Sequence, residues 1–470
     1  MISNKNLKAS LVFVGGGVPS LILAFAMTKF HKLPICIIEK SHEVGGQYKS
    51  LVYKNGIVFD QGMHIYYETG ITEIDSVLLQ IIPDYDWHFL KDNEKDVAGI
   101  FYNGKLQTNS PYPDLRDLSQ KDKDRFVSSI FENINNININ ITGNAGELLR
   151  NHFGNYLAEE IFKPILQNLY GIHYDDLSSI VFKLTAINRV VLYNEDTTLD
   201  LMSSVYLKDR IAYPDQMKLP IKRTNRSRGL YPRKFGFGGV IEILRKKLEE
   251  RGVIFFTNTE VLGIRTSNNI INSIVIKTER EDEYDLQVAT GVVWASDIYS
   301  LLRNFNINLE YKMDFGHKKF VNLLTKQKPR MGNLYYFYNF DSASKIFRVT
   351  NYSEYCLRAL YDGNYPICIE YWSENESNED IISSVIIDLV KMGVIDNESE
   401  VIFAHVPEYK AIFPKPLVKT VSSIELASSK LLDLEINNLV HIGSYSKPEV
   451  FFLHEILKDA FVQVKNKGWI

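Results

Sequence analysis

Cysteine is scarce in this sequence, with three among 470 residues, at positions 36, 356 and 368. Their wide spacing leaves no C-x-x-C pair, which excludes the common zinc and redox-disulfide motifs. Such usage fits a reducing compartment, and we expect a cytoplasmic protein. Cys36 lies in an apolar run, so we expect a buried side chain there and not a nucleophile.

An excess of one charge and long apolar runs are also missing. The formal net charge is only −4, which gives no indication of nucleic acid or an anionic membrane as a partner. The stretch Leu11–Met27 is interrupted by three glycines and a proline, so we expect neither a signal peptide nor a membrane span. The sequence has no P-loop, G-x-S-x-G or H-E-x-x-H pattern, and we expect no metal site.

The composition is that of an ordinary globular protein. Hydrophobic residues make up 45% and charged residues 23% of the chain. A chain of 470 residues is too long for one compact core, so two or three lobes are expected.

The most informative stretch is a glycine turn at residues 15–20. Two apolar runs, Leu11–Val14 and Leu21–Met27, flank the turn, and the next apolar run spans Pro34–Glu39. This order predicts a strand, a turn, a helix and a second strand that ends on an acidic residue. It is the layout of a dinucleotide-binding βαβ unit.

Individual residues of this turn have definite roles in such a unit. Gly15 allows the tight turn, and Gly17 lets a pyrophosphate approach the helix N-terminus. Ser20 replaces the third glycine but is still small, and Pro19 is tolerated because first-turn amides have no intrahelical partner. Glu39 is placed to accept hydrogen bonds from a ribose. A glycine-rich turn of another α/β fold is the alternative, and the surrounding pattern favours dinucleotide binding over it.

The remaining pattern predicts an α/β fold with a discontinuous Rossmann-type domain and an inserted α+β substrate domain. We assign residues 1–90, 230–300 and 415–470 to the dinucleotide domain, and residues 91–229 and 301–414 to the substrate domain. The expected helices are Tyr156–Asn168, Val240–Arg251 and Pro448–Lys465. The expected strands are Val253–Phe256, Val261–Thr266, Ile270–Lys277, Gly291–Ala295, Leu334–Tyr338, Ile367–Tyr371 and Leu439–Ile442.

Five stretches together resemble the FAD enzymes related to glutathione reductase, in particular the group of amine oxidases, protoporphyrinogen oxidase and UDP-galactopyranose mutase. Val44–Gln47 is similar to a Gly-Gly motif that lines the FAD phosphates, and Phe59–Tyr67 to the Gly-Pro-His segment beside the flavin ring. The segment from Phe162 to Val190 resembles a family stretch in which Tyr170 replaces tryptophan. The other two stretches are residues 15–20 with Glu39, and His441–Ser444.

This resemblance implies FAD as the cofactor and makes the dinucleotide domain an FAD-binding domain. It also implies that a helix N-terminus near Pro448–Phe451 stabilises charge on the reduced flavin. The residues that it places around the cofactor are Gly15, Gly17, Pro19, Ser20, Glu39, Lys40, Gly46, Gln47, Gly62, Met63, His64, Val261, Gly443, Ser444, Val450 and Phe451.

Three residues are candidates for catalysis. His64 lies in a glycine-containing loop, where it would touch the flavin or the substrate, or alternatively have a structural role. Arg348 resembles an active-site arginine of the mutases that would clamp a diphosphate or a carboxylate, and a surface salt bridge is the alternative. Tyr336 shares a strand face with Tyr338 and would belong to an aromatic cage beside the flavin, or alternatively to the core.

These residues predict an FAD-dependent oxidoreductase-type enzyme acting on a small molecule, with a nucleotide-sugar or another glycan-pathway compound as the favoured substrate. The first alternative is a non-redox sugar mutase, and the second is a flavin-binding protein without turnover. Ser444 argues against the mutase, because mutases carry a diphosphate-binding arginine there. Lys447 or Arg348 would have to replace it.

Overall fold

The computed structural model describes residues 7–134, 143–224, 227–234, 236–280, 282–310, 314, 316–373, 375–408, 415–444, 446–447 and 449–470. The chain divides into two compact units. Unit 1 comprises Met1–Phe89, Gly229–Lys312 and Ser422–Ile470, and unit 2 comprises Leu90–Arg228 and Met313–Val421. Residues 301–312 thus lie in unit 1 and residues 415–421 in unit 2. The assignment of cofactor and substrate binding to separate domains stays a prediction.

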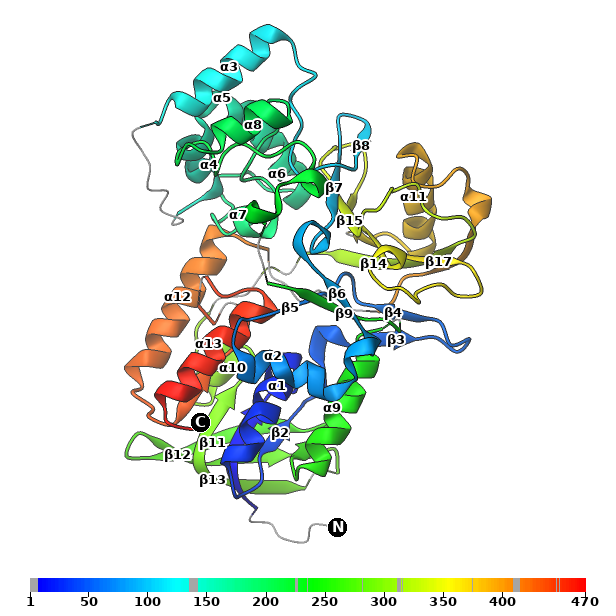
Figure 1. Ribbon diagram of the computed structural model, residues 1–470. Coiled ribbons are helices and arrows are strands. Elements are labelled where there is room, and N and C mark those ends of the chain that lie inside the picture. The colour runs from blue at the N-terminus through cyan, green and yellow to red at the C-terminus, as the bar shows by residue number, and fades with distance from the viewer. Residues whose placement is uncertain are drawn as a thin grey trace. The chain divides into compact units, whose positions relative to one another are not determined.

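Unit 1 is built on a parallel sheet (Figure 1), which bears out the predicted α/β class. Leu11–Val14 is buried throughout, as is typical of an interior strand of such a sheet. The spatial order is the doubly wound one, in which the strand order reverses between the first and the fourth strand along the chain. The parallel strands, in spatial order, are β10 (Ile254–Phe256), β2 (Cys36–Ile38), β1 (Lys8–Val14), β13 (Glu283–Trp294) and β19 (Leu439–His441).

The predicted hairpin is confirmed as β11 (Glu260–Ser267) and β12 (Ile270–Lys277), which pair antiparallel. β12 also pairs with the first half of β13 and thereby extends the sheet. Two small sheets are also present, one of β3 (Ser50–Val52) and β4 (Val58–Asp60), the other in the order β5–β9–β6. The strands of this three-stranded sheet are β5 (Tyr66–Tyr67), β9 (Gly229–Pro232) and β6 (Trp87–Leu90).

Helix α1 (Val18–Met27) is apolar on nearly every side and packs against three other helices. These are α2 (Thr72–Ile81), α9 (Gly238–Glu250) and α13 (Leu453–Asn466). The prediction that the last helix begins near Pro448 is wrong, since α13 begins at Leu453; Pro448 itself lies outside the described residues. Two further helices are α10 (Ile298–Arg303) and α12 (Val418–Asp433), the latter shared between the units.

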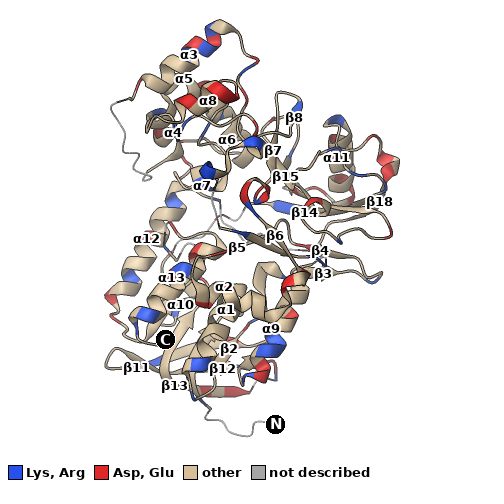
Figure 2. Ribbon diagram, viewed as in Figure 1, with Lys and Arg blue, Asp and Glu red and all other residues tan. Residues whose placement is uncertain are grey.

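Unit 2 contains a mixed sheet in the order β18–β14–β17–β16–β15–β7–β8. The predicted strand Leu334–Tyr338 begins two residues later, at Tyr336. Lys, Arg, Asp and Glu are interspersed along the elements of both units (Figure 2). The strands are β7 (Ala98–Tyr102), β8 (Lys105–Gln107), β14 (Lys318–Thr325), β15 (Tyr336–Asn339), β16 (Ile346–Asn351), β17 (Tyr365–Trp372) and β18 (Val401–His405).

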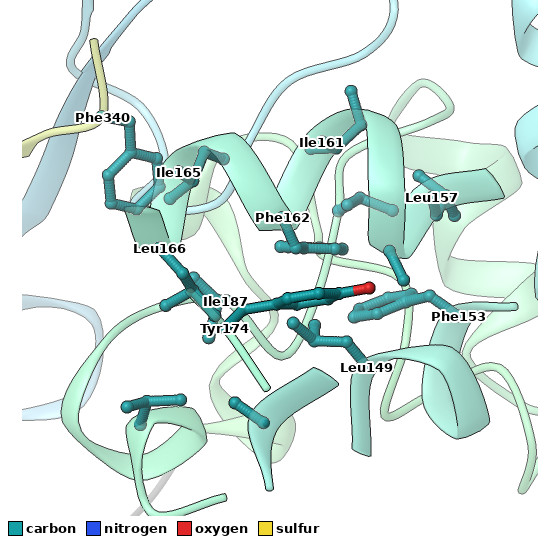
Figure 3. Close-up of a cluster of buried hydrophobic side chains, with 14 of the residues drawn as sticks. Leu149, Phe153, Leu157, Ile161, Phe162, Ile165, Leu166, Tyr174, Ile187 and Phe340 are labelled. Carbon is teal, nitrogen blue, oxygen red and sulfur yellow. The ribbon is translucent and has the colours of Figure 1, made fainter. Parts of the chain in front are cut away.

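The helices of unit 2 enclose a second apolar core, in which the Tyr174 ring lies among side chains such as Phe153 and Phe162 (Figure 3). The predicted helix Tyr156–Asn168 is present but widens into a π-helical turn before Pro164, which has no N–H to donate. The elements are α3 (Gln120–Phe131), α4 (Ala145–Phe153), α5 (Asn155–Leu157), the π-turn Ala158–Phe162, α6 (Lys163–Tyr170), α7 (Val181–Leu184), α8 (Glu195–Leu201) and α11 (Asn378–Lys391).

Candidate functional site

The glycine turn lies at the point where the strand order of the parallel sheet reverses. Gly15 has φ +103°, and a Cβ there would lie 2.8 Å from the carbonyl oxygen of Ala295, just after β13. Only glycine combines this backbone conformation with so close an approach. The turn is therefore held against the carboxyl end of the neighbouring strand, where ligands bind in open α/β sheets.

No side chain of the described residues caps the N-terminus of α1. Its N-cap is Gly17, which provides no side-chain cap, and the first turn contains Pro19 and no acidic residue. The Ser20 hydroxyl is buried and has no hydrogen-bond partner among the described residues. First-turn amides have no intrahelical partner, so this end of α1 can receive an anionic ligand.

Glu39 and the second pair of glycines close around this turn. The Glu39 carboxylate accepts the Gly16 N–H and the Ser41 N–H, both at 2.8 Å. The Gly45 N–H donates to the Gly16 carbonyl at 2.7 Å, and a Cβ on Gly46 would lie 3.6 Å from the Gly17 Cα. Glu39 thus stabilises the turn. A ribose hydroxyl would have to donate to the Glu39 lone pairs that these two amides leave unused.

The loop that contains His64 lies on the residues that follow this glycine pair. The His64 ring packs on Tyr48, with centroids 4.4 Å apart. Gly62 is buried with φ +85°, and Met63 and His64 are half-buried. The Gln47 Oε1 atom is buried without a hydrogen-bond partner among the described residues. Gln47 is therefore a residue whose polar atom a ligand can satisfy.

The carboxyl end of β19 brings the last predicted segment to the same sheet edge. The Ile442 N–H donates to the Trp294 carbonyl at 2.9 Å, and Gly443 follows with φ +138°. The Ser444 hydroxyl donates to the Phe451 carbonyl at 3.1 Å, while Val450 is buried.

The prediction that a helix N-terminus at Pro448–Phe451 stabilises flavin charge is wrong, because α13 begins at Leu453. Val450 and Phe451 precede the helix, so they do not contribute first-turn amides. The Glu455 carboxylate accepts the N–H groups of Phe451 (3.1 Å) and Phe452 (3.0 Å). This end of α13 thus carries its own negative charge.

Lys40 and Val261 lie toward the outer strands of the sheet. The Lys40 ammonium pairs with Glu260 at 2.7 Å, and both side chains are largely exposed. Val261, the next residue, is half-buried in β11. The part of both residues in cofactor binding stays a prediction.

A buried carboxylate that the sequence did not single out, Asp60, ends β4. It is fully buried and accepts hydrogen bonds from the Ser50 hydroxyl (2.5 Å), the Tyr231 hydroxyl (2.5 Å) and the Phe237 N–H (3.0 Å). Gly238 donates its N–H to Ser50 Oγ at 2.8 Å, and a Cβ on Gly238 would lie 2.7 Å from the Ser50 nitrogen. The backbone at the start of α9 therefore packs directly on Ser50 and on this carboxylate.

Unit 2 contains the other two catalytic candidates in one polar cluster. The Arg348 Nε donates to Glu370 Oε1 at 2.5 Å, and Lys318 Nζ lies 3.0 Å from Oε2 of the same carboxylate. The rings of Tyr336 and Tyr338 share one strand face, 5.5 Å apart, and both contact the Arg348 guanidinium.

The Glu370 contact corrects the alternative of a surface salt bridge for Arg348, while its part in substrate binding stays a prediction. The Arg348–Glu370 ion pair is largely buried and not on the surface. The Nε and Nη2 atoms of Arg348 already bind the Glu370 carboxylate. Burial lowers the pKa of Arg348, but the charge of Glu370 outweighs it and the net pKa is raised. The sequence signal for Glu370 was a single carboxylate inside the apolar strand Ile367–Tyr371.

Comparison with known proteins supports the fold described above. Residues 14–76 match the NAD(P)-binding Rossmann-like domain family. No curated protein sequence matches the chain. Reduced UDP-galactopyranose mutase is similar over 99% of this chain and 95% of its own, with a TM-score of 0.73 and 14% identity. The chain has the fold of the amine-oxidase-like flavoenzymes.

Two further structures share this flavoenzyme fold. An Exiguobacterium sp. 255-15 protein assigned as a protoporphyrinogen oxidase matches over 98% of both chains, with a TM-score of 0.66 and 16% identity. Putrescine oxidase bound to putrescine matches over 98% of this chain and 99% of its own, with a TM-score of 0.60 and 12% identity. Within the described ranges, none of the helices has the length and apolar character needed to span a bilayer.

Proposed function

We propose that the chain binds FAD in unit 1, with the pyrophosphate at the glycine turn. The observation that carries this proposal is the open N-terminus of α1 at the point where the strand order reverses. Gly15, Gly17 and the first-turn amides would hold the phosphates. Glu39 would accept a ribose hydroxyl beside its two backbone contacts.

The side chains present fit such a ligand. The Ser20 hydroxyl and Gln47 Oε1 are buried polar atoms without hydrogen-bond partners among the described residues, and both belong to the predicted FAD set. Leaving such atoms unsatisfied costs about 1–3 kcal/mol each. A ligand along the carboxyl edge of the sheet would supply partners for them. Bound flavin supplies the capacity to accept and return electrons.

We infer an oxidoreductase-type flavoenzyme, with a nucleotide-sugar or another glycan-pathway compound as substrate. In this proposal His64 orients the substrate or the flavin ring, and Arg348 and Tyr336 belong to the substrate domain. Arg348 would present only its Nη1 atom to an anion, because Glu370 binds Nε and Nη2. Nη1 itself donates to the Tyr338 hydroxyl at 3.5 Å.

A sugar mutase is the second candidate, because the chain matches reduced UDP-galactopyranose mutase along nearly its whole length. The mutase arginine is replaced by Ser444, whose hydroxyl binds Phe451. Of the two possible replacements, Lys447 pairs with Asp459 and Arg348 with Glu370. These contacts weigh against the mutase, because they leave neither cation free to replace the missing arginine.

A screen of UDP- and dTDP-sugars on the purified protein separates the candidates. Loss of the flavin colour on adding a substrate, followed by recovery in air, supports the oxidoreductase. An isomerised sugar formed only after dithionite reduction supports the mutase. Bound FAD with neither reaction supports a flavin-binding protein without turnover. A protein that does not take up FAD contradicts the whole proposal.

A further inference from the structure

The segment Gln61–Ile65, which carries His64, is fastened to β9 at both ends. Before the segment, the Asp60 carboxylate accepts the Tyr231 hydroxyl. After it, Tyr66 on β5 pairs with Leu230 on β9. Within it, the Gly62 N–H donates to the Asp60 carbonyl at 3.0 Å. One short strand and one buried carboxylate therefore help to hold the two ends of this segment.

A continuous chain of contacts leads from that carboxylate to the His64 ring. Asp60 accepts the N–H of Phe237, whose ring meets Tyr48 edge-on with centroids 5.4 Å apart. Tyr48 in turn packs on His64. Phe237 and Tyr48 are both buried, so neither ring can shift without disturbing its neighbours.

We propose that Asp60 is a positioning residue, whose ionised carboxylate holds Gln61–Ile65 and the His64 ring in the arrangement that receives FAD. This inference rests on the proposed FAD binding. Only the ionised carboxylate can accept from the Ser50 hydroxyl, the Tyr231 hydroxyl and the Phe237 amide without itself having to donate a hydrogen bond. Once protonated, it must donate one, and one of these contacts has to change.

The charge state of Asp60 should change within an accessible pH range. Burial raises its pKa to about 6, against the opposing effect of its hydrogen bonds to Ser50, Tyr231 and Phe237. Among the described residues, the phenols of Tyr231 and Tyr48 face it. Burial and the charge of Asp60 raise the pKa of Tyr48, which therefore stays neutral in this range. If FAD binds only when Asp60 is ionised, the apparent Kd should be about tenfold higher at pH 5 than at pH 7.

The experiment is a titration of the full-length protein, freed of bound flavin, with FAD between pH 5 and pH 8. We expect the Kd of the wild type to rise at low pH with a midpoint near 6, and that of Asp60→Asn to stay constant. Tyr231→Phe removes one donor to the carboxylate, so its midpoint should move to higher pH. Tyr206→Phe, which removes a buried phenol hydrogen bond to the Ile130 carbonyl in unit 2, is the matched control.

A wild-type Kd that is flat across this range, or a pH profile unchanged in Asp60→Asn, would overturn the inference while leaving FAD binding intact. Hydrogen exchange of residues 61–65 in the FAD-free protein gives a second readout. We expect their protection factors to fall at low pH in the wild type and not in Asp60→Asn. If no variant binds FAD, the proposed function fails, and the exchange data still decide whether Asp60 holds the segment.

Discussion

Replacing Glu370 by glutamine should destabilise unit 2 more than replacing Lys318 by methionine. The carboxylate is buried and bonds to both Arg348 and Lys318. Glu370→Gln keeps the shape but leaves two neighbouring positive charges without their counter-ion. Breaking a buried ion pair from one side costs about 3–5 kcal/mol. We expect a loss of that size in the free energy of unfolding.

Lys318→Met provides the matched comparison. It leaves one arginine on one carboxylate, and its side chain would lie over the Phe347 ring, which the Lys318 ammonium approaches to 3.8 Å. We expect a change of less than about 1 kcal/mol, because burial already disfavours the charged form of Lys318 and Arg348 remains as the counter-ion of Glu370. Urea unfolding followed by circular dichroism measures both variants. A Lys318→Met cost equal to that of Glu370→Gln would refute this reasoning.

The pH dependence of the free energy of unfolding tests the direction of the Lys318 pKa shift. Burial is the main cause of its lowered pKa, with a contribution from the positive charge of Arg348. The unfolded chain therefore binds more protons than the folded one between the lowered pKa and the ordinary value. Stability should rise with pH across that window, and Lys318→Met should remove this rise.

Three further variants test unit 1. Gly15→Ala should abolish FAD uptake, because φ is +103° and the new Cβ would lie 2.8 Å from Ala295; in the control Gly252→Ala, φ is +81° but nothing lies within 4 Å, so uptake should persist. Glu39→Gln should raise the Kd for FAD by about fivefold in a titration, since one amide near the turn loses its acceptor at a cost of about 1 kcal/mol. Asp60 has a raised pKa in the folded state, so its contribution to stability is greatest at low pH and is lost as the pH rises through about 6. Between pH 7 and pH 5 the wild type should gain roughly 1 kcal/mol from this group, and Asp60→Asn should not, as urea unfolding at each pH would show.

Much of unit 1 was predictable because local chemistry determines it. The apolar run before Gly15 and the glycine turn specify a buried strand followed by a helix. The hairpin at residues 260–277 followed from two short β-branched runs. The strand order, which brings Ala295 and Ile442 to the same sheet edge as Gly15, depends on long-range pairing that no local pattern contains.

The charged clusters were harder to predict, because their partners are far apart in sequence. Asp60 lay inside a recognised motif, but its donors come from Ser50, Tyr231 and Phe237, and only the folded chain brings these together. Arg348 was recognised as a candidate, yet its partner Glu370 lies on the neighbouring strand. The start of α13 was misplaced by five residues, since the sequence does not show that Glu455 caps the amides before it.

The visible spectrum of the purified protein, with mass analysis of the compound released on denaturation, tests FAD binding in unit 1 most directly. We predict the absorption of an oxidised flavin, and about one FAD released per chain from the wild type but not from Gly15→Ala. A colourless, folded wild-type protein that fails to take up added FAD would contradict the account.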